Sequence, residues 1–165
     1  LKALDWRRGM IMQIELQQAQ GDRPGMIETH EQILERHPDE DGIRLALAVL
    51  YQNEERWSDA DAQFVLLLDA ERPELARTAR YQRARTRVLG RYEQDEAVRI
   101  LEQFIQDFPA DFDGRPSKAD AFWRMGNAQE QLGERDAALA SYRQALALRP
   151  EHEDAQKALK VLEAS

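Results

Sequence analysis

Apolar residues recur along this chain at the three- and four-residue spacing of one helix face, in stretches that close at prolines. These stretches read ETHEQILERHP to Pro38, DAQFVLLLDAERP to Pro73, AVRILEQFIQDFP to Pro109 and ALASYRQALALRP to Pro150. The spacing predicts four amphipathic helices, and each proline predicts the end of the helix before it. The prolines recur every 35 to about 40 residues, a period typical of stacked helical hairpins.

Helix-forming residues dominate the rest of the chain as well. Alanine, leucine, glutamine, glutamate and arginine are frequent, and all of them favour helices. No alternating run of β-branched residues marks a strand, and Asp41-Gly42 and Asp113-Gly114 lie between helical stretches rather than between strands. We therefore predict an all-α fold.

The most regular copy of the repeat begins at Ala119 and reads ADAFWRMGNAQEQLGERDAALASYRQALALRP. It resembles a tetratricopeptide repeat, and the positions that carry the resemblance are Phe122, Met125, Gly126, Gln129, Ala138, Tyr142, Ala145 and Pro150. Gln129 departs from the family, which has an aromatic residue there. Gly126 and Ala138 are small where two helices of a hairpin must approach closely. Gly133 is expected to take the left-handed conformation that ends the first helix.

Three weaker copies precede this one when the chain is aligned on its prolines. The four repeats span about 7–40, 41–74, 75–110 and 119–152, and the amphipathic stretch 153–163 is expected to cap the array. The resemblance implies a right-handed superhelical solenoid of antiparallel helix hairpins, a single domain over 1–165. Asp22 just ahead of Pro24 is expected to start a helix. Because the chain begins with leucine, we expect a fragment or a processed form.

Composition narrows the classes of function. The 165 residues are 42% apolar and 33% charged, with a net charge of −8, so binding to nucleic acid or to an anionic membrane is not expected. The absence of cysteine excludes disulfides, thiolate metal sites and cysteine nucleophiles. No stretch approaches the ~20 apolar residues of a membrane-spanning helix. We expect a soluble protein; the cytoplasm is favoured, and the periplasm stays open.

The three histidines do not form a metal motif. His30-Glu31 opens like the zinc-protease motif, but Leu34 stands where the second histidine is needed. His30 is expected to pack in the core instead, while His37 and His152 are expected to lie in surface loops.

The acidic stretch Asp111–Gly114 resembles part of a calcium loop. Pro109 occupies the first ligand position of that loop, so we expect a solvated linker there. The sequence also has no glycine-rich phosphate loop and no serine with a histidine base nearby. We therefore predict no metal, no cofactor and no catalysis.

In the tetratricopeptide family, side chains of the first helix of each repeat line an inner groove. Mapped onto this chain, the resemblance implies a partner-binding groove of Ile11, Met12, Glu15, Leu45, Val49, Gln52, Gln82, Arg83, Thr86, Trp123, Arg124 and Asn127. The family's clamp for terminal carboxylates is not expected. Its lysine positions hold Ile11, Leu45, Gln82 and Trp123.

Two features of this groove have alternative interpretations. Trp123 follows Phe122, so it leans toward the groove if Phe122 is in the core, or it packs on a neighbouring helix. Arg80, Arg83 and Arg87 share a helix face. That face is either solvated, offsetting nearby acidic residues, or attracts an anionic partner peptide.

The predicted function is that of a non-catalytic adaptor or scaffold domain. Its concave groove is expected to bind a protein or peptide segment that carries acidic and apolar residues. Two alternatives stay open. One is self-association into a homo-oligomer, and the other is a role as an accessory domain of a larger enzyme or complex.

Overall fold

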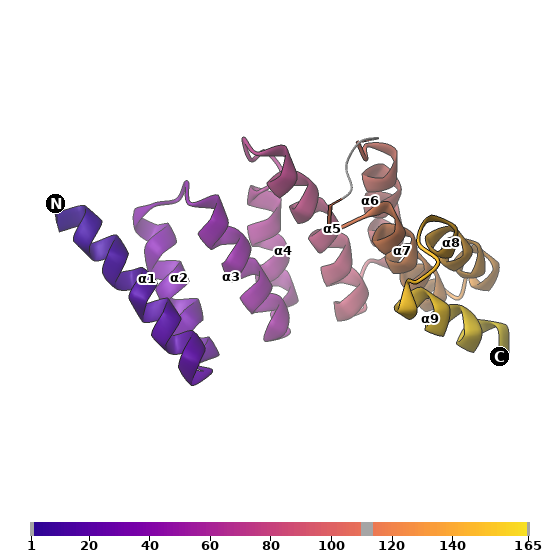
Figure 1. Ribbon diagram of the computed structural model, residues 1–165, viewed down its shortest axis with the longest axis horizontal. Coiled ribbons are helices and arrows are strands. Elements are labelled where there is room, and N and C mark those ends of the chain that lie inside the picture. Colours follow the sequence, from indigo (N-terminus) through magenta and orange to yellow (C-terminus); the bar gives the residue numbers. More distant parts are fainter. Residues whose placement is uncertain (1, 110–113, 165) are drawn as a thin grey trace. The chain divides into compact units, whose positions relative to one another are not determined.

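The computed structural model describes residues 2–109 and 114–164, with side chains from Trp6 onward. Over these residues the chain forms α-helices and no strand (Figure 1). The helices are α1 Lys2–Gln20, α2 Arg23–Arg36, α3 Asp41–Asn53, α4 Trp57–Leu66, α5 Pro73–Gly90, α6 Gln94–Gln106, α7 Lys118–Leu132, α8 Arg135–Leu148 and α9 Glu153–Ala164. The prediction of an all-α chain of helix hairpins is confirmed. None of these helices is long and apolar enough to cross a membrane.

The helices belong to two compact units, which divide between Leu75 and Ala76. In the first unit α1 packs on α2, α2 on α3, and α3 on α4. In the second unit α6 packs on α7, α7 on α8, and α8 on α9. Consecutive helices within a unit lie side by side as hairpins (Figure 1). That all four repeats act as one domain stays a prediction.

The turn between the two helices of a repeat has the same backbone conformation in all four copies. Left-handed residues end the first helices: Gly21 (φ 69°), Glu55 (φ 57°), Arg91 (φ 57°) and Gly133 (φ 78°). The next N–H donates to a carbonyl five residues back, in the pairs Asp22–Gln17, Arg56–Tyr51, Tyr92–Arg87 and Glu134–Gln129. This bond satisfies a carbonyl that the helix end leaves open. The prediction for Gly133 is confirmed, and the weaker repeats reach the same geometry without glycine.

The predicted start of α2 is confirmed too. The Asp22 carboxylate accepts a hydrogen bond from the Gly25 N–H at 3.0 Å. Pro24 lies in the first turn, where its missing N–H has no intrahelical partner to lose.

The prolines lie in two different places relative to the helices. Helices α2, α6 and α8 end two or three residues before Pro38, Pro109 and Pro150. His37 and Arg149 have extended backbones (φ −135° and −144°), because the residue before a proline is sterically excluded from the helical region. Pro73 was wrongly predicted to stop a helix: α4 ends at Leu66, and Pro73 is the first residue of α5.

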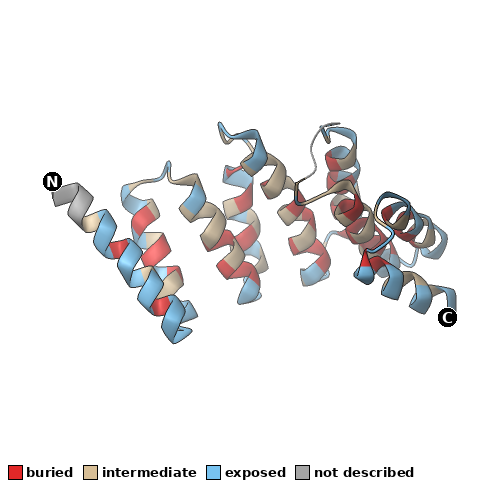
Figure 2. Ribbon diagram, in the orientation of Figure 1, coloured by how far each residue is buried: buried red, intermediate tan, exposed pale blue. Residues whose placement is uncertain are grey.

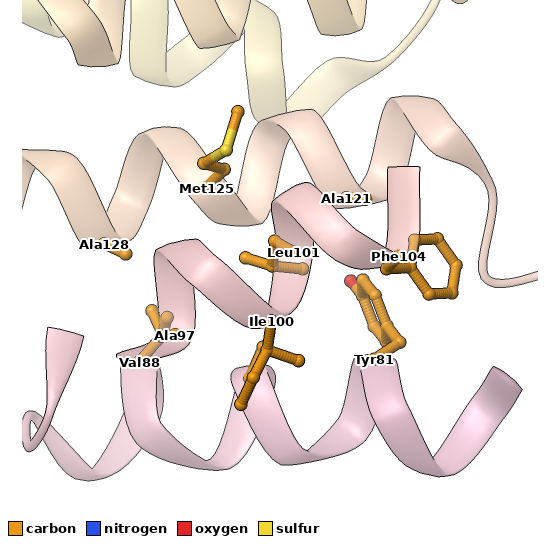
Figure 3. Packing of buried hydrophobic residues seen from close by; sticks show 10 residues of the cluster. Tyr81, Val88, Ala97, Ile100, Leu101, Phe104, Ala121, Met125 and Ala128 are labelled. Carbon is orange, nitrogen blue, oxygen red and sulfur yellow. The ribbon is translucent and has the colours of Figure 1, made fainter. Parts of the chain in front are cut away.

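The core of the second unit joins three helices, as Figure 3 shows. Its buried residues are Tyr81, Ala84 and Val88 of α5, Ala97, Ile100, Leu101 and Phe104 of α6, and Ala121, Met125 and Ala128 of α7. The rings of Tyr81 and Phe104 lie 5.7 Å apart. Buried residues recur along one side of the helices (Figure 2), which is the pattern that the sequence predicts.

Gly126 shows why a small residue is needed at the hairpin crossing. A Cβ atom at this position would lie 2.4 Å from the Tyr142 ring, closer than carbon atoms can approach. Ala138 and Tyr142 are fully buried on the facing helix. The predicted close approach of α7 and α8 is therefore confirmed.

A buried hydrogen bond accounts for Gln129, the residue that departs from the family pattern. The Ser141 hydroxyl donates to the Gln129 side-chain oxygen at 2.6 Å. The first repeat has the same arrangement, where the Thr29 hydroxyl donates to the Gln17 side-chain oxygen at 3.0 Å. A polar pair across the hairpin thus replaces aromatic packing in these two repeats, and a buried amide is tolerated because it is hydrogen-bonded.

Candidate functional site

In the first unit, a cavity lies along the helices that the sequence singles out. It has a volume of about 690 Å³, and its lining includes Leu45 and Val49 of α3 together with Ile14, Met26 and His30. The predicted groove residues Ile11, Met12 and Glu15 of α1 are exposed, but they do not line this cavity.

His30 lies at this cavity and is 4% exposed. Burial lowers the pKa of His30, and the hydrogen bond between its Nδ1 and the Met26 carbonyl oxygen only partly opposes this effect. The ring is therefore neutral and packed, as the sequence predicts.

Three of the predicted groove residues are buried in the fold. Gln52 is 3% exposed, Arg124 is 7% exposed and Thr86 is fully buried. The Thr86 hydroxyl donates to the Gln82 carbonyl oxygen at 2.8 Å, within α5. The Thr86 hydroxyl is therefore occupied within its own helix.

The second unit has its own cavity, formed by the C-terminal halves of α5 and α7. Its volume is about 450 Å³, and its lining residues are Val88, Leu89, Arg91, Arg124, Asn127, Glu130 and Gln131. Arg124 and Asn127 belong to the predicted groove, whereas Gln82, Arg83 and Trp123 do not line this cavity. The apolar wall and Arg91 are not part of the predicted set.

A series of hydrogen bonds fixes the polar side chains that line this cavity. The Asn127 side-chain nitrogen donates to the Tyr142 hydroxyl at 2.9 Å, and that hydroxyl donates to the Glu130 carboxylate. Burial raises the pKa of Tyr142, and the hydrogen bond with Glu130 raises it further. The Gln131 side chain reaches across to α5 and donates to the Val88 carbonyl oxygen at 3.0 Å.

Arg124 is the buried cation of this cavity. It is 7% exposed, and its Nε has no hydrogen-bond partner. Its guanidinium carbon lies 4.1 Å from the centre of the Trp123 ring. Within the part of the chain that the structure describes, no carboxylate forms an ion pair with Arg124.

Trp123 belongs to a second cluster, at the other end of α7. Its ring lies 5.4 Å from the ring of His152, so packing on a neighbouring element is the interpretation that the structure favours. His152 was wrongly predicted to lie in a surface loop, because it is only 6% exposed. His152 Nδ1 accepts a hydrogen bond from the Ala155 N–H at 3.4 Å, in the first turn of α9.

Asp120 links this cluster to the start of α7. Its carboxylate accepts hydrogen bonds from Arg149 at 2.7 Å and Arg115 at 2.6 Å, and it forms a capping box with Ser117. Burial alone raises the pKa of Asp120, but the bonds from Arg149 and Ser117 outweigh burial and hold it well below its usual range. His152 Nε2 lies 3.5 Å from the same carboxylate.

The predicted arginine stripe on α5 is only partly solvated. Arg80 pairs with Asp107 at 2.9 Å near the surface. Arg87, in contrast, is 6% exposed, and its guanidinium pairs with Glu93 at 3.2 Å. The interpretation as a solvated face is therefore wrong for Arg87.

The structure shows no cluster of metal-binding side chains among the residues that it describes. Most of the calcium-like stretch, Asp111–Asp113, lies outside those residues.

Comparisons with known proteins agree with this architecture. Models of the tetratricopeptide repeat match residues 78–111 and 119–152. No curated protein matches the sequence. Solved structures with a similar fold include MamA 41-end from Desulfovibrio magneticus RS-1, with a TM-score of 0.75, 15% identity, and coverage of 95% of this chain and 83% of that one. Another solved MamA protein has a TM-score of 0.72, 18% identity, and coverage of 93% and 78%.

These likenesses concern the fold. The two matched segments coincide with the third and fourth repeats of the sequence. All four repeats share the left-handed turn and the helix hairpin. Residues 78–111 and 119–152 are tetratricopeptide repeats.

Proposed function

We propose that this protein is a non-catalytic interaction module and that the second unit binds a segment of a partner protein in the cavity between α5 and α7. The observation that carries the proposal is the cavity of about 450 Å³, which combines an apolar wall, Val88 and Leu89, with the polar side chains of Arg124 and Asn127. Apolar surface supplies binding free energy, and a few fixed polar groups set orientation.

The fold supports this proposal. Repeat proteins of this kind present extended surfaces to other chains. Leu89 is 40% exposed at the cavity, so it offers apolar area to a partner without any rearrangement of the core. The cavity of the first unit, with Leu45 and Val49 in its lining, is proposed as a second contact surface.

Site-specific photocrosslinking tests the proposal. A photoreactive amino acid replaces Leu89 at the cavity in one variant and Glu102, an exposed residue of α6, in the control. We expect a discrete crosslinked partner from position 89 in cells of the source organism and none from position 102.

Three other outcomes each count against the proposal. Equal crosslinking from both positions would show that the cavity is not the binding surface, and no product from position 89 would contradict partner binding there. A product at twice the mass of the chain itself would instead establish self-association.

A further inference from the structure

Among the residues that the structure describes, no carboxylate pairs with the buried guanidinium of Arg124. An unpaired charge in a low-dielectric interior is costly, so buried charges in folded proteins are normally paired. Here the ring of Trp123 offers a cation–π contact at 4.1 Å, which is weaker than an ion pair with a carboxylate. The guanidinium also donates a hydrogen bond to the Tyr81 hydroxyl, whereas its Nε–H group has no partner among the described residues.

Two further arginines near Arg124 add positive charge, which favours an anion at this place. Burial lowers the pKa of Arg85 on α5, and the positive charge of Arg124 lowers it further, so the two guanidinium groups are close enough to repel. Arg91 adds another cation to the cavity lining. Arg91 has a left-handed backbone (φ 57°) at the end of α5, a position that usually favours glycine.

One acidic residue, Glu130, also lines the cavity. Its carboxylate accepts the Tyr142 hydroxyl, and no ion pair joins it to Arg124 among the described residues. Two arginines against one glutamate leave the lining with a net positive charge, in a chain whose total charge is −8. A singly charged anion fits this balance better than a phosphate, which Glu130 would repel more strongly.

We propose that this cavity binds an aspartate or glutamate side chain of the partner segment, with Arg124 as its ion-pair partner. This inference rests on the proposed function. The guanidinium of Arg124 pairs with the carboxylate, Arg91 adds charge at the rim, and Val88 and Leu89 contact the methylene carbons of the acidic side chain. A side chain is favoured over a terminal carboxylate, because the lysine of the family's terminal clamp is absent.

The test follows the arginine Nε–H signals of the ¹⁵N-labelled protein by NMR. The probes are N-acetylglutamate methylamide, its neutral glutamine counterpart, and N-acetylglycine as a terminal carboxylate. We expect the glutamate probe to shift the Arg124 signal saturably, and the other two to leave it near its starting position. The signal is assigned by its loss in Arg124→Lys.

Three variants sharpen the result. Arg124→Met should weaken binding of the glutamate probe at least about tenfold, since a hydrogen bond to a charged group is among the stronger polar contacts. Arg91→Gln, at an exposed rim position, should weaken it without affecting the fold. Arg143→Gln, which removes a surface ion pair with Glu163, should leave it unchanged. Circular dichroism checks that each variant is folded.

The inference is overturned if the Arg124 signal does not move, moves no more than that of Arg143, or responds equally to the glutamine probe. An equal response to N-acetylglycine would overturn the assignment to a side chain. The proposed function has a separate test: if position 89 still captures its partner while the glutamate probe has no effect, only the acidic side chain is refuted.

Discussion

Replacing Arg124 with methionine should make the second unit more stable, although the substitution removes a well-packed side chain. Arg124 is 7% exposed and forms no ion pair with the described carboxylates. Exchanging buried charges for apolar side chains of similar size is often neutral or stabilising, by about 1–4 kcal/mol. The lost cation–π contact with Trp123 offsets about 0.5–2 kcal/mol of this gain. We expect a net stabilisation on the order of 1 kcal/mol.

The matched control is Arg149→Met in the same unit. Arg149 is also largely buried, but it pairs with Asp120 at 2.7 Å, with side-chain exposures of 18% and 13%. Removing one partner of a fully buried pair costs about 3–5 kcal/mol. Because this pair is partly solvated and Arg115 still contacts Asp120, we expect a loss on the order of 1–2 kcal/mol. The two arginine variants should therefore change stability in opposite directions.

Urea unfolding followed by circular dichroism measures both changes. A shift of the midpoint at constant slope reports stability itself, and 1 kcal/mol corresponds to about 2–4 °C in Tm for a chain of this size. If Arg124→Met lowers the midpoint as much as Arg149→Met does, Arg124 is satisfied within the fold. No anion would then be needed to explain the burial of Arg124.

Three further predictions concern packing, turns and pH. Gly126→Ala should destabilise the protein by about 1–3 kcal/mol, because the new Cβ meets a tyrosine ring of α8. Gly9→Ala has nothing within 4 Å of the new Cβ and should stabilise the protein by about 0.5–1 kcal/mol. Thermal unfolding compares the two variants. Glu55→Gly should raise Tm by a few degrees, because Glu55 has a left-handed backbone (φ 57°) that glycine adopts without strain; an unchanged Tm would contradict this. Burial lowers the pKa of His152 from its usual 6.5, so the unfolded chain takes up the proton first and stability should fall as the pH drops below about 6.5 and stay level above it. His152→Asn replaces the capping Nδ1 with a side-chain oxygen that does not titrate. This variant should show a weaker pH dependence, measured by unfolding at pH 5 to about 8.

The hairpin architecture is predictable because its causes are local. The apolar spacing fixes which face of each helix is buried, and Asp22 fixes the start of α2 through a bond within three residues. Gly126 and Gly133 are informative because glycine is the residue that a close crossing or a left-handed turn favours. At Glu55 and Arg91 the same turn forms without that signal, since the fold imposes it.

The candidate site is harder to predict because its properties depend on residues far apart in the sequence. Position within a repeat correctly brings Arg124 and Asn127 to one cavity. It does not reveal that Arg124 is buried without an ion pair, since that depends on which side chains α5 contributes. It also places Thr86 in the groove, whereas its hydroxyl bonds to its own helix and the residue is fully buried. The position of a residue within a repeat predicts which way its side chain points, but its exposure depends on how the neighbouring helices pack.

The contrast between Arg124 and Arg149 carries the functional argument. Both are guanidinium groups packed in the second unit. Arg149 has a carboxylate at 2.7 Å, whereas Arg124 contacts the Trp123 ring and the Tyr81 hydroxyl and pairs with no carboxylate of the described residues. Stability alone favours pairing such a charge or replacing it, so an unpaired arginine at a cavity is better explained by a charge that arrives with a partner. The free protein is then destabilised by the unpaired charge of Arg124 before any partner binds. Binding of an acidic side chain should remove this destabilisation. The partner segment should therefore stabilise the native chain more than the Arg124→Met variant.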